Sequence, residues 1–240
     1  MSAVAASPKS YKNLVLASLP KADLALLTPH LSPTNLASGK TLLSPGEDIV
    51  YAYFLESGLA SVVVAMADGS TVEAGIIGNE GVVGIPGLLG TKSMPTRTFM
   101  QIAGTGFRIK AQRLSEQYEK PGTLRKQLNR YFQAHLVQTA QTAACNRLHD
   151  IAQRLARWLL MCHDRMESDS FAITHEFLAH MLGTPRTTVT LAAGILNKAG
   201  VITYSRGRVH VLDRKGLEKA SCECYRTIRN EYDRLGIASV

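Results

Sequence analysis

The sequence predicts an α+β protein: an antiparallel β-roll of the jelly-roll type, then a long helix, then a winged helix-turn-helix. Three observations lead to this prediction. Short β-rich runs alternate with turn residues over 39–110. A long helical pattern follows, and two short helices with a hairpin after them occupy 174–211. We therefore divide the chain into a β-roll domain with short N-terminal helices (1–122), a long helix (123–145) and a winged helix-turn-helix domain (146–240).

Composition and charge narrow the class of protein. Apolar residues make up 45% of the 240 residues and charged residues 19%, which is typical of a folded chain with one or two domains. No run of about 18 apolar residues predicts a membrane span, and Met1–Pro8 lacks the pattern of a signal peptide, so we expect a cytoplasmic protein. The net charge is +8, and 171–215 holds six Lys or Arg against two Asp or Glu. A basic segment of this kind fits a polyanionic partner, although a solubilising surface would look the same.

The N-terminal half carries the strand signals. After two short helices predicted within 11–31, the β-rich runs Ile49–Leu55, Ala60–Val64 and Thr98–Ile102 are the clearest strands. Asp68-Gly69 lies between two apolar stretches and is the strongest hairpin signal among the turns. Glu80 is expected in a surface turn. The alternation of short runs and turns favours an antiparallel roll or barrel.

A helix of about 20 residues is predicted next, with Thr123 as its cap. Such a helix is about 30 Å long, and its apolar stripe is wider than a small β-domain can easily cover. We therefore interpret it as a dimerisation helix that packs against a second copy, the alternative being packing within one chain. The residues predicted to form the dimer contact are Leu124, Leu128, Tyr131, Phe132, His135, Leu136 and Thr139. A further helix, Arg147–Met166, is predicted to place Leu148, Ile151, Leu155, Trp158, Leu159 and Cys162 on a core face.

The segment 173–202 carries the most specific pattern. Thr174 is predicted to cap a helix that Gly183 ends in a left-handed turn. Thr184-Pro185 then starts a second helix, with Pro185 at its first position, where the missing N–H costs nothing. Two short helices joined by a tight turn containing glycine are typical of proteins that place the second helix in the major groove of DNA.

The second helix and the hairpin after it supply the predicted DNA contacts. Arg186 is the expected base-reading residue, because a guanidinium can bind guanine in a bidentate way. Arg206 and Arg208 lie near the tip of a basic hairpin, the wing, where they would meet phosphates. A helical hairpin that only packs is the alternative. The full predicted set is Thr174, Thr184, Arg186, Thr187, Thr188, Thr190, Lys198, Arg206 and Arg208.

With these features together, the chain resembles the CRP/FNR family of bacterial transcription regulators over nearly its full length. The resemblance implies a homodimer that binds a pseudo-palindromic site on double-stranded DNA and contacts RNA polymerase. In that family the recognition helix begins Arg-Glu-Thr-Val, and this chain keeps Arg186, Thr188 and Val189. It departs at Thr187, where the Glu would accept from cytosine, and at Leu191, where a second Arg often lies. The usual half-site of the family is therefore not assumed.

The resemblance also raises the question of a nucleotide in the roll. Members that bind cyclic nucleotides use a cassette ending in Gly-Glu, followed by Arg-Ser or Arg-Thr about ten residues later. This chain has Gly84-Ile85-Pro86 where the acid is expected, although Arg97-Thr98 remain. An apolar side chain cannot accept the ribose hydrogen bond, so control by cAMP is not expected, and an apolar effector, an unknown one or none is favoured. The residues of the possible effector pocket are Gly84, Ile85, Leu88, Arg97 and Thr98.

No cofactor, metal site or catalytic residue is predicted. Cys222 and Cys224 have Cys-x-Cys spacing rather than Cys-x-x-Cys, and no N-terminal cysteine cluster is present for an iron–sulfur centre, so Cys145, Cys162, Cys222 and Cys224 are interpreted as ordinary thiols. Redox sensing through Cys145, near the hinge, stays a lesser hypothesis. The spacing of His175-Glu176 and His180 does not match a metalloprotease motif. The alternative function is a ligand-sensing module, with a cyclic nucleotide in the β-roll, that acts through protein contacts.

Overall fold

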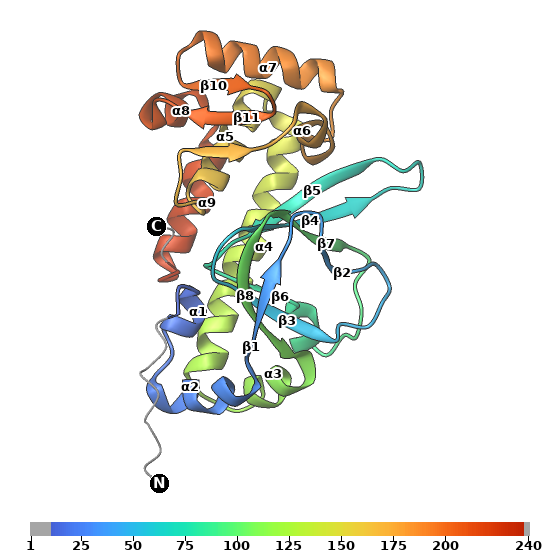
Figure 1. The fold of residues 1–240 in the computed structure, drawn as a ribbon, viewed down its shortest axis with the longest axis vertical. Coiled ribbons are helices and arrows are strands. Elements are labelled where there is room, and N and C mark those ends of the chain that lie inside the picture. The colour runs from blue at the N-terminus through green and yellow to red at the C-terminus, as the bar shows by residue number, and fades with distance from the viewer. Residues whose placement is uncertain (1–10, 238–240) are drawn as a thin grey trace.

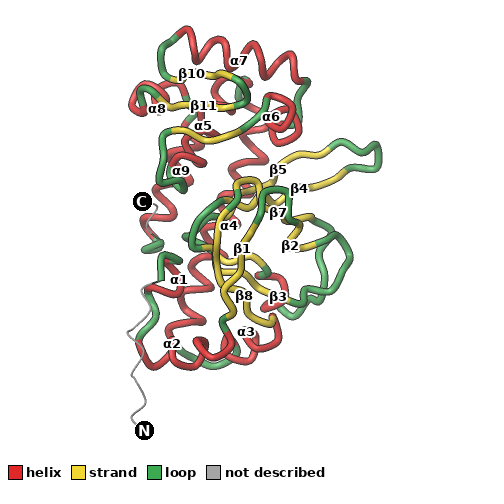
Figure 2. Tube along the Cα trace, in the orientation of Figure 1, coloured by secondary structure: helices red, strands yellow, loops and turns green. Residues whose placement is uncertain are grey.

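The computed structural model describes residues 11–237, and the stretch Met1–Pro8 considered above lies outside them. Figure 1 shows an elongated molecule in which a β-roll and its flanking helices lie at one end and a smaller helical domain at the other. The long helix α4 runs along the β-roll and into the helical domain. Figure 2 separates the strands of the roll from a small sheet in the second domain. Among the helices described, none is both long and apolar enough to cross a membrane.

Short helices precede the roll, as predicted for 11–31. They are α1 (Leu14–Ala17), α2 (Lys21–Leu27) and the 3-10 turn η1 (Thr28–His30). The side chain of Asn13 caps α1 by accepting a hydrogen bond from the Leu16 N–H, and its amide donates to the carbonyls of Leu55 and Gly81. Asn13 is completely buried, so these bonds satisfy its polar atoms and attach the N-terminal helices to the roll.

The β-roll consists of two four-stranded antiparallel sheets, with strand orders β1-β8-β3-β6 and β2-β7-β4-β5. The hairpin predicted at Asp68-Gly69 is present between β4 and β5, where Gly69 has a φ of +83° and Asp68 accepts from the Ser70 N–H. Apolar side chains from both sheets fill the space between them. The strands are β1 (Ser32–Leu36), β2 (Thr41–Leu43), β3 (Tyr51–Leu55), β4 (Leu59–Ala65), β5 (Thr71–Ile77), β6 (Val82–Val83), β7 (Arg97–Ile102) and β8 (Gly104–Lys110), with the 3-10 turn η2 (Ile85–Leu88) after β6.

The long helix α4 (Thr123–Leu148) follows α3 (Ala111–Tyr118) and continues three residues past its predicted end. Gly122 rather than Thr123 is its N-cap, with no side-chain cap bond. The dimer prediction needs a correction for Leu124, Leu128 and Tyr131. These side chains are at most 5% exposed and pack in the chain's own core, so they are not free to contact a second copy.

The first helix of the C-terminal domain is shorter than predicted. The helix expected over 147–166 is α5 (Ile151–His163), which Asp150 caps by accepting from the Gln153 N–H, and Leu148 is 73% exposed at the end of α4 rather than part of a core face. Strand β9 (Ser170–Ala172), which the sequence did not indicate, pairs with the wing. The other elements are α6 (His175–Leu182), α7 (Arg186–Lys198), β10 (Ile202–Ser205), β11 (Arg208–Val211), α8 (Arg214–Ala220) and α9 (Glu223–Arg234).

Buried polar contacts join the two domains. Glu80 was predicted to lie in a surface turn, and this is wrong, because its side chain is 2% exposed and pairs with Arg165 Nε at 2.8 Å. Glu73 on β5 is also buried and accepts from Trp158 Nε1 on α5 at 2.8 Å. The turn after β5 faces the C-terminal domain instead of solvent, so the carboxyl groups of both residues form hydrogen bonds with that domain in place of water.

Candidate nucleic-acid interface

The first helix of the helix-turn-helix is built as its sequence predicts. The Thr174 hydroxyl accepts from the Phe177 N–H at 3.1 Å and caps α6. Gly183 ends the helix with a φ of +57°, which favours a residue without a side chain. Pro185 is the N-cap of α7 rather than its first residue, and residues 183–185 form the turn between the two helices.

The second helix, α7, buries one face and exposes the other. Val189, Ala192 and Leu196 are at most 2% exposed and attach it to the domain core. The Arg186 side chain is 68% exposed, and its only ion pair among the residues described is a loose one of 3.8 Å to Glu176. A guanidinium held this weakly at the start of an exposed helix is available to another acceptor.

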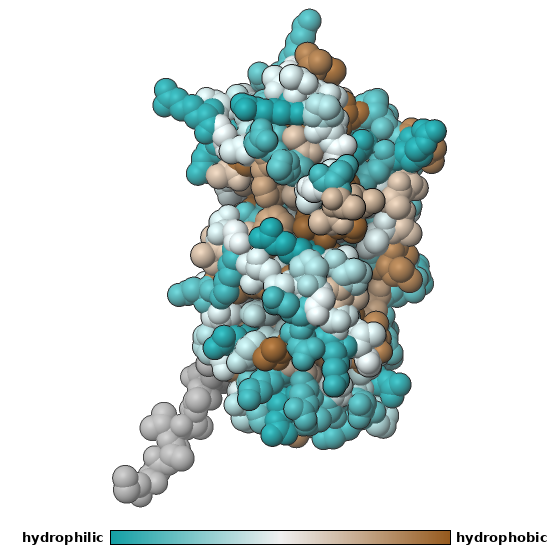
Figure 3. Space-filling view, turned by 90° about the vertical axis from the view of Figure 1, so that its right-hand side faces the viewer, coloured by the Kyte–Doolittle hydropathy of each residue, from teal (hydrophilic) through white to brown (hydrophobic). Residues whose placement is uncertain are grey.

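Two large apolar side chains also lie on the exposed face. Leu191 is 70% exposed and Ile195 is 59% exposed, one helical turn apart. Figure 3 shows hydrophobic surface at the upper end of the molecule, where α7 lies in Figure 1. From the sequence, Leu191 was identified only as a departure from the family pattern, and Ile195 was not identified. Their spacing from Thr187 was the available signal, because i, i+4 and i+8 share one helix face.

The predicted threonines differ in how free they are. Thr187 and Thr190 are exposed, while Thr184 and Thr188 are half-buried. The Thr190 hydroxyl donates to the Arg186 carbonyl at 3.0 Å and lies 3.0 Å from His175 Nδ1. Thr187 therefore has the more available hydroxyl of the two exposed threonines, and Lys198 is exposed at the far end of the helix.

The wing is a two-residue hairpin between β10 and β11. Its turn residues, Arg206 and Gly207, both have positive φ, 49° and 72°, as a type I′ turn requires. Glycine adopts this conformation freely, whereas arginine does so at a cost. Arg206 and Arg208 are exposed, so the turn displays two cations on the wing.

Comparison with known proteins agrees with this architecture. Residues 153–220 match the family model of the Crp-like helix-turn-helix domain. Similar solved structures include a CRP/FNR-family regulator from Eubacterium rectale (17% identity, 84% of this chain and 94% of that chain, TM-score 0.67) and FixK2 from Bradyrhizobium japonicum (15% identity, 80% and 98%, TM-score 0.69). A CRP/FNR-family regulator from Thermus thermophilus is 19% identical over 79% and 98%, with a TM-score of 0.65. Comparison with curated protein sequences finds no match.

The C-terminal domain is a Crp-like helix-turn-helix domain, and the chain has the fold of the CRP/FNR-family structures. Its β-roll, long helix and helix-turn-helix follow one another as in the structures of that family. Both the predicted fold class and the resemblance are confirmed.

The β-roll contains a cavity of about 370 Å³ against α4. Its lining is uncharged at neutral pH, since burial lowers the pKa of its single histidine, His135, to about 4. A phosphate in this cavity would find no cation among the lining side chains. The lining residues are Leu43, Val62, Ile77, Val82, Val83, Gly84, Ile85, Pro86, Leu89, Met94, Thr96, Thr98, Phe132, His135, Leu136 and Thr139.

The residues predicted for an effector pocket do not all meet there. Gly84, Ile85 and Thr98 line the cavity, but Leu88 is buried outside its lining. Arg97 is exposed, donates to the Thr41 hydroxyl at 2.9 Å and covers the ring of Phe99, so its charge is directed away from the cavity.

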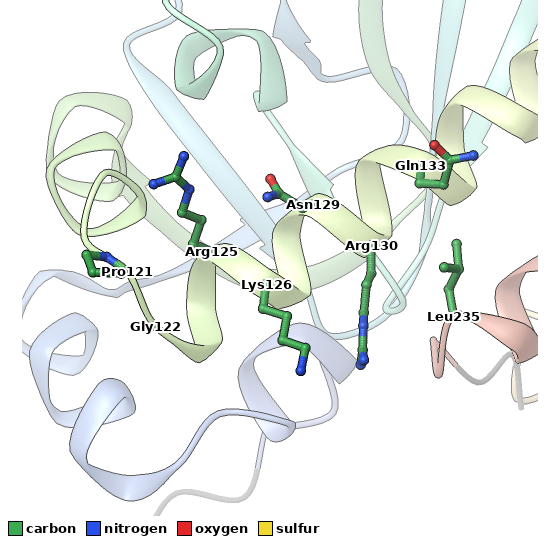
Figure 4. A pocket seen from close by; sticks show the side chains of 8 residues that line it. All are labelled: Pro121, Gly122, Arg125, Lys126, Asn129, Arg130, Gln133 and Leu235. Carbon is green, nitrogen blue, oxygen red and sulfur yellow. The ribbon is translucent and has the colours of Figure 1, made fainter.

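A larger groove, about 560 Å³, lies beside the start of α4 and the end of α9. Figure 4 shows that its basic side chains do not converge, because Arg125 points one way while Lys126 and Arg130 point another. The groove therefore lacks the arrangement of a phosphate site.

Proposed function

We propose that this regulator binds a pseudo-palindromic DNA site as a homodimer and is not controlled by cAMP. The exposed face of α7 is the observation that carries the proposal, because it presents Arg186 to a major groove. Arg186 would read guanine, and Leu191 and Ile195 would contact thymine methyl groups. Arg206 and Arg208 would bind phosphates, which position the helix without reading sequence.

Replacing Arg186 by alanine is expected to weaken binding to the specific duplex about 10- to 100-fold, because a bidentate contact to guanine contributes about 1–3 kcal/mol of discrimination. Binding to unrelated duplexes should change little. Fluorescence anisotropy with a site taken from genome-wide mapping would measure both, over a series of salt concentrations. Arg113→Ala is the control, since Arg113 is exposed on α3.

The outcomes of this experiment separate the parts of the proposal. Added cAMP should leave the affinities unchanged, because the cavity lacks a cation and Arg97 lies outside it. A rise in the affinity for the specific duplex when cAMP is added would contradict the proposal that cAMP does not control the protein. Absence of binding to any duplex at low salt would contradict DNA recognition and favour a module that acts through protein contacts.

The exposed side of α4 supports the homodimer. Leu136 is 64% exposed at the edge of the β-roll cavity, and Phe132 and Thr139 are half-buried beside it. Further along the helix, Ala140 and Ala143 are exposed, and small side chains let two helices approach closely. The proposed contact is therefore centred on Leu136 and these alanines, without the buried Leu124, Leu128 and Tyr131.

Leu136→Arg is expected to dissociate the dimer into monomers of 26.1 kDa, because it places a charge at the centre of the contact. Analytical ultracentrifugation of the full chain would measure the mass. Leu26→Arg is a matched control, since Leu26 is a 53% exposed leucine on α2. A wild-type protein of monomer mass at micromolar concentration would contradict the homodimer.

A further inference from the structure

Three cysteines and a histidine that are far apart in the sequence meet where α4 ends and α9 begins. Cys145 lies in the last turn of α4 and His149 follows that helix, whereas Cys222 caps α9 and Cys224 lies in its first turn. Their ligand atoms all lie within 4.8 Å of one another. The three thiols are at most 4% exposed and form a cluster separate from the main core.

Two of the distances within the cluster are close to the edges of a tetrahedron around one ion. Cys145 Sγ is 3.5 Å from Cys222 Sγ, and Cys224 Sγ is 3.5 Å from His149 Nδ1. With the usual metal–ligand bond lengths, tetrahedral Zn²⁺ separates two sulfur ligands by about 3.8 Å and a sulfur and a nitrogen by about 3.5 Å. An iron–sulfur cluster places several ions between its thiolates and needs a wider spacing. The cluster therefore has the dimensions of a single-ion site.

The groups around the four residues are those that support metal ligands. His149 Nε2 lies 3.2 Å from the carboxylate of Glu223, which leaves Nδ1 directed at the sulfurs. Metal-binding histidines usually have such a partner on their other nitrogen. Gln141 Nε2 donates to Cys224 Sγ at 3.2 Å, and the N-terminus of the twelve-residue α9 favours negative charge on a thiolate.

A buried arginine near the cluster gives an electrostatic reason to expect a negatively charged site there. Arg157 is 3% exposed, and its Nη1 donates to the hydroxyl of Thr142, one turn before Cys145 on α4. Within residues 11–237 no carboxylate lies within ion-pair distance of Arg157, and its Nε has no hydrogen-bond partner, although Glu73 interacts with it electrostatically from further away. Three thiolates, one Zn²⁺ and a neutral imidazole sum to one negative charge. A loaded site would therefore add a negative charge near a buried guanidinium that has no direct ion pair.

We propose that Cys145, His149, Cys222 and Cys224 bind one Zn²⁺ ion, which ties the end of the long helix to α9. Thiolate and imidazole ligands favour this ion, and four protein ligands leave no open position, as in structural zinc sites. The site joins the helix proposed to dimerise to the domain that carries α7. Its role is to hold the orientation of the DNA-binding domain relative to α4.

The test is metal analysis of the full-length protein, expressed with zinc in the medium and purified without chelators. We expect one zinc per chain by mass spectrometry of the metal, and thiolate–cobalt absorption bands of a tetrahedral site after exchange with Co²⁺. Cys222→Ser and His149→Ala should lose the zinc. Glu223→Gln should weaken zinc affinity about 10- to 100-fold, as loss of a ligand's hydrogen-bond partner does.

Cys162→Ser is the matched control, because Cys162 is an equally buried thiol on α5 outside the cluster, and it should keep the zinc. Circular dichroism reports whether each variant folds, and the cobalt spectrum of the wild-type protein tests the site without any substitution. The proposal is overturned by a folded wild-type protein that binds neither zinc nor cobalt, by zinc that Cys222→Ser retains, by stoichiometric iron and sulfide, or by a Cys145–Cys222 disulfide in freshly purified protein. None of these results depends on DNA binding.

Discussion

Replacing Glu80 by alanine is expected to lower the free energy of unfolding by about 3–5 kcal/mol, because it leaves the guanidinium of Arg165 buried without its partner. The two side chains are 2% and 5% exposed, so water cannot replace the lost carboxylate. Glu80 also accepts from the Gly78 N–H, which would lose its partner too. Urea denaturation followed by circular dichroism would measure the change.

A surface ion pair is the comparison for this result. Lys12 and Glu167 lie 2.6 Å apart but are 59% and 83% exposed, so Glu167→Ala should change the free energy of unfolding little. The double variant Glu80→Met/Arg165→Met should be less destabilised than Glu80→Ala, since neither charge then stays unpaired. Equal small losses for Glu80→Ala and Glu167→Ala would contradict the buried pair.

Between about pH 4.5 and pH 7 the contribution of Glu73 to stability is expected to fall by about 3 kcal/mol as the pH rises. Buried His135, whose pKa is lowered to about 4, contributes in the opposite direction, so the effect of Glu73 is the difference between the wild type and a Glu73 variant. Burial raises the pKa of this carboxyl from 4.5 to about 7, although hydrogen bonds from Ser61 and Trp158 oppose the shift. Across this range the folded protein therefore binds a proton that the unfolded chain releases. The contribution of Glu73 to stability is fully present at pH values below its pKa in the unfolded chain, and it is lost as the pH rises through its pKa in the folded protein.

The hydrogen bonds around Glu73 agree with a protonated side chain. The Ser61 hydroxyl lies 2.7 Å from Glu73 Oε2 and 2.6 Å from Gln101 Oε1, yet its one proton can serve only one of them. A protonated Glu73 resolves the conflict, because it donates to Ser61 and Ser61 donates to Gln101. Glu73→Gln should therefore fold, and the stability of the wild type relative to this variant should fall by about 3 kcal/mol between pH 4.5 and pH 7, as measured by urea denaturation at several pH values. Glu167→Gln should follow the wild type, and a wild-type-minus-Glu73→Gln difference that stays constant or rises with pH would contradict the assignment.

The helix-turn-helix could be predicted closely because its signals are local. Thr174 caps α6 through a backbone N–H three residues away, and Gly183 ends the helix through its own φ. The boundary between α4 and α5 was harder to predict, because the helical pattern continues through 145–151 and only the side chain of Asp150 marks the break. Glu80 was misplaced for a related reason. A charged residue between two glycines resembles a surface turn, and its partner lies 85 residues later.

The order of the elements could be predicted from the sequence: a β-roll, a long helix and a winged helix-turn-helix with Arg186 at the start of its second helix. Periodicity, caps and turns depend on neighbouring residues, and these are visible in a linear chain. Three features could be seen only in the folded chain: the exposed side of α4, the position of Arg97 outside the β-roll cavity, and the contact of Cys145 with Cys222. Burial and contact depend on segments that are distant in the chain, and no local pattern records which of them will meet.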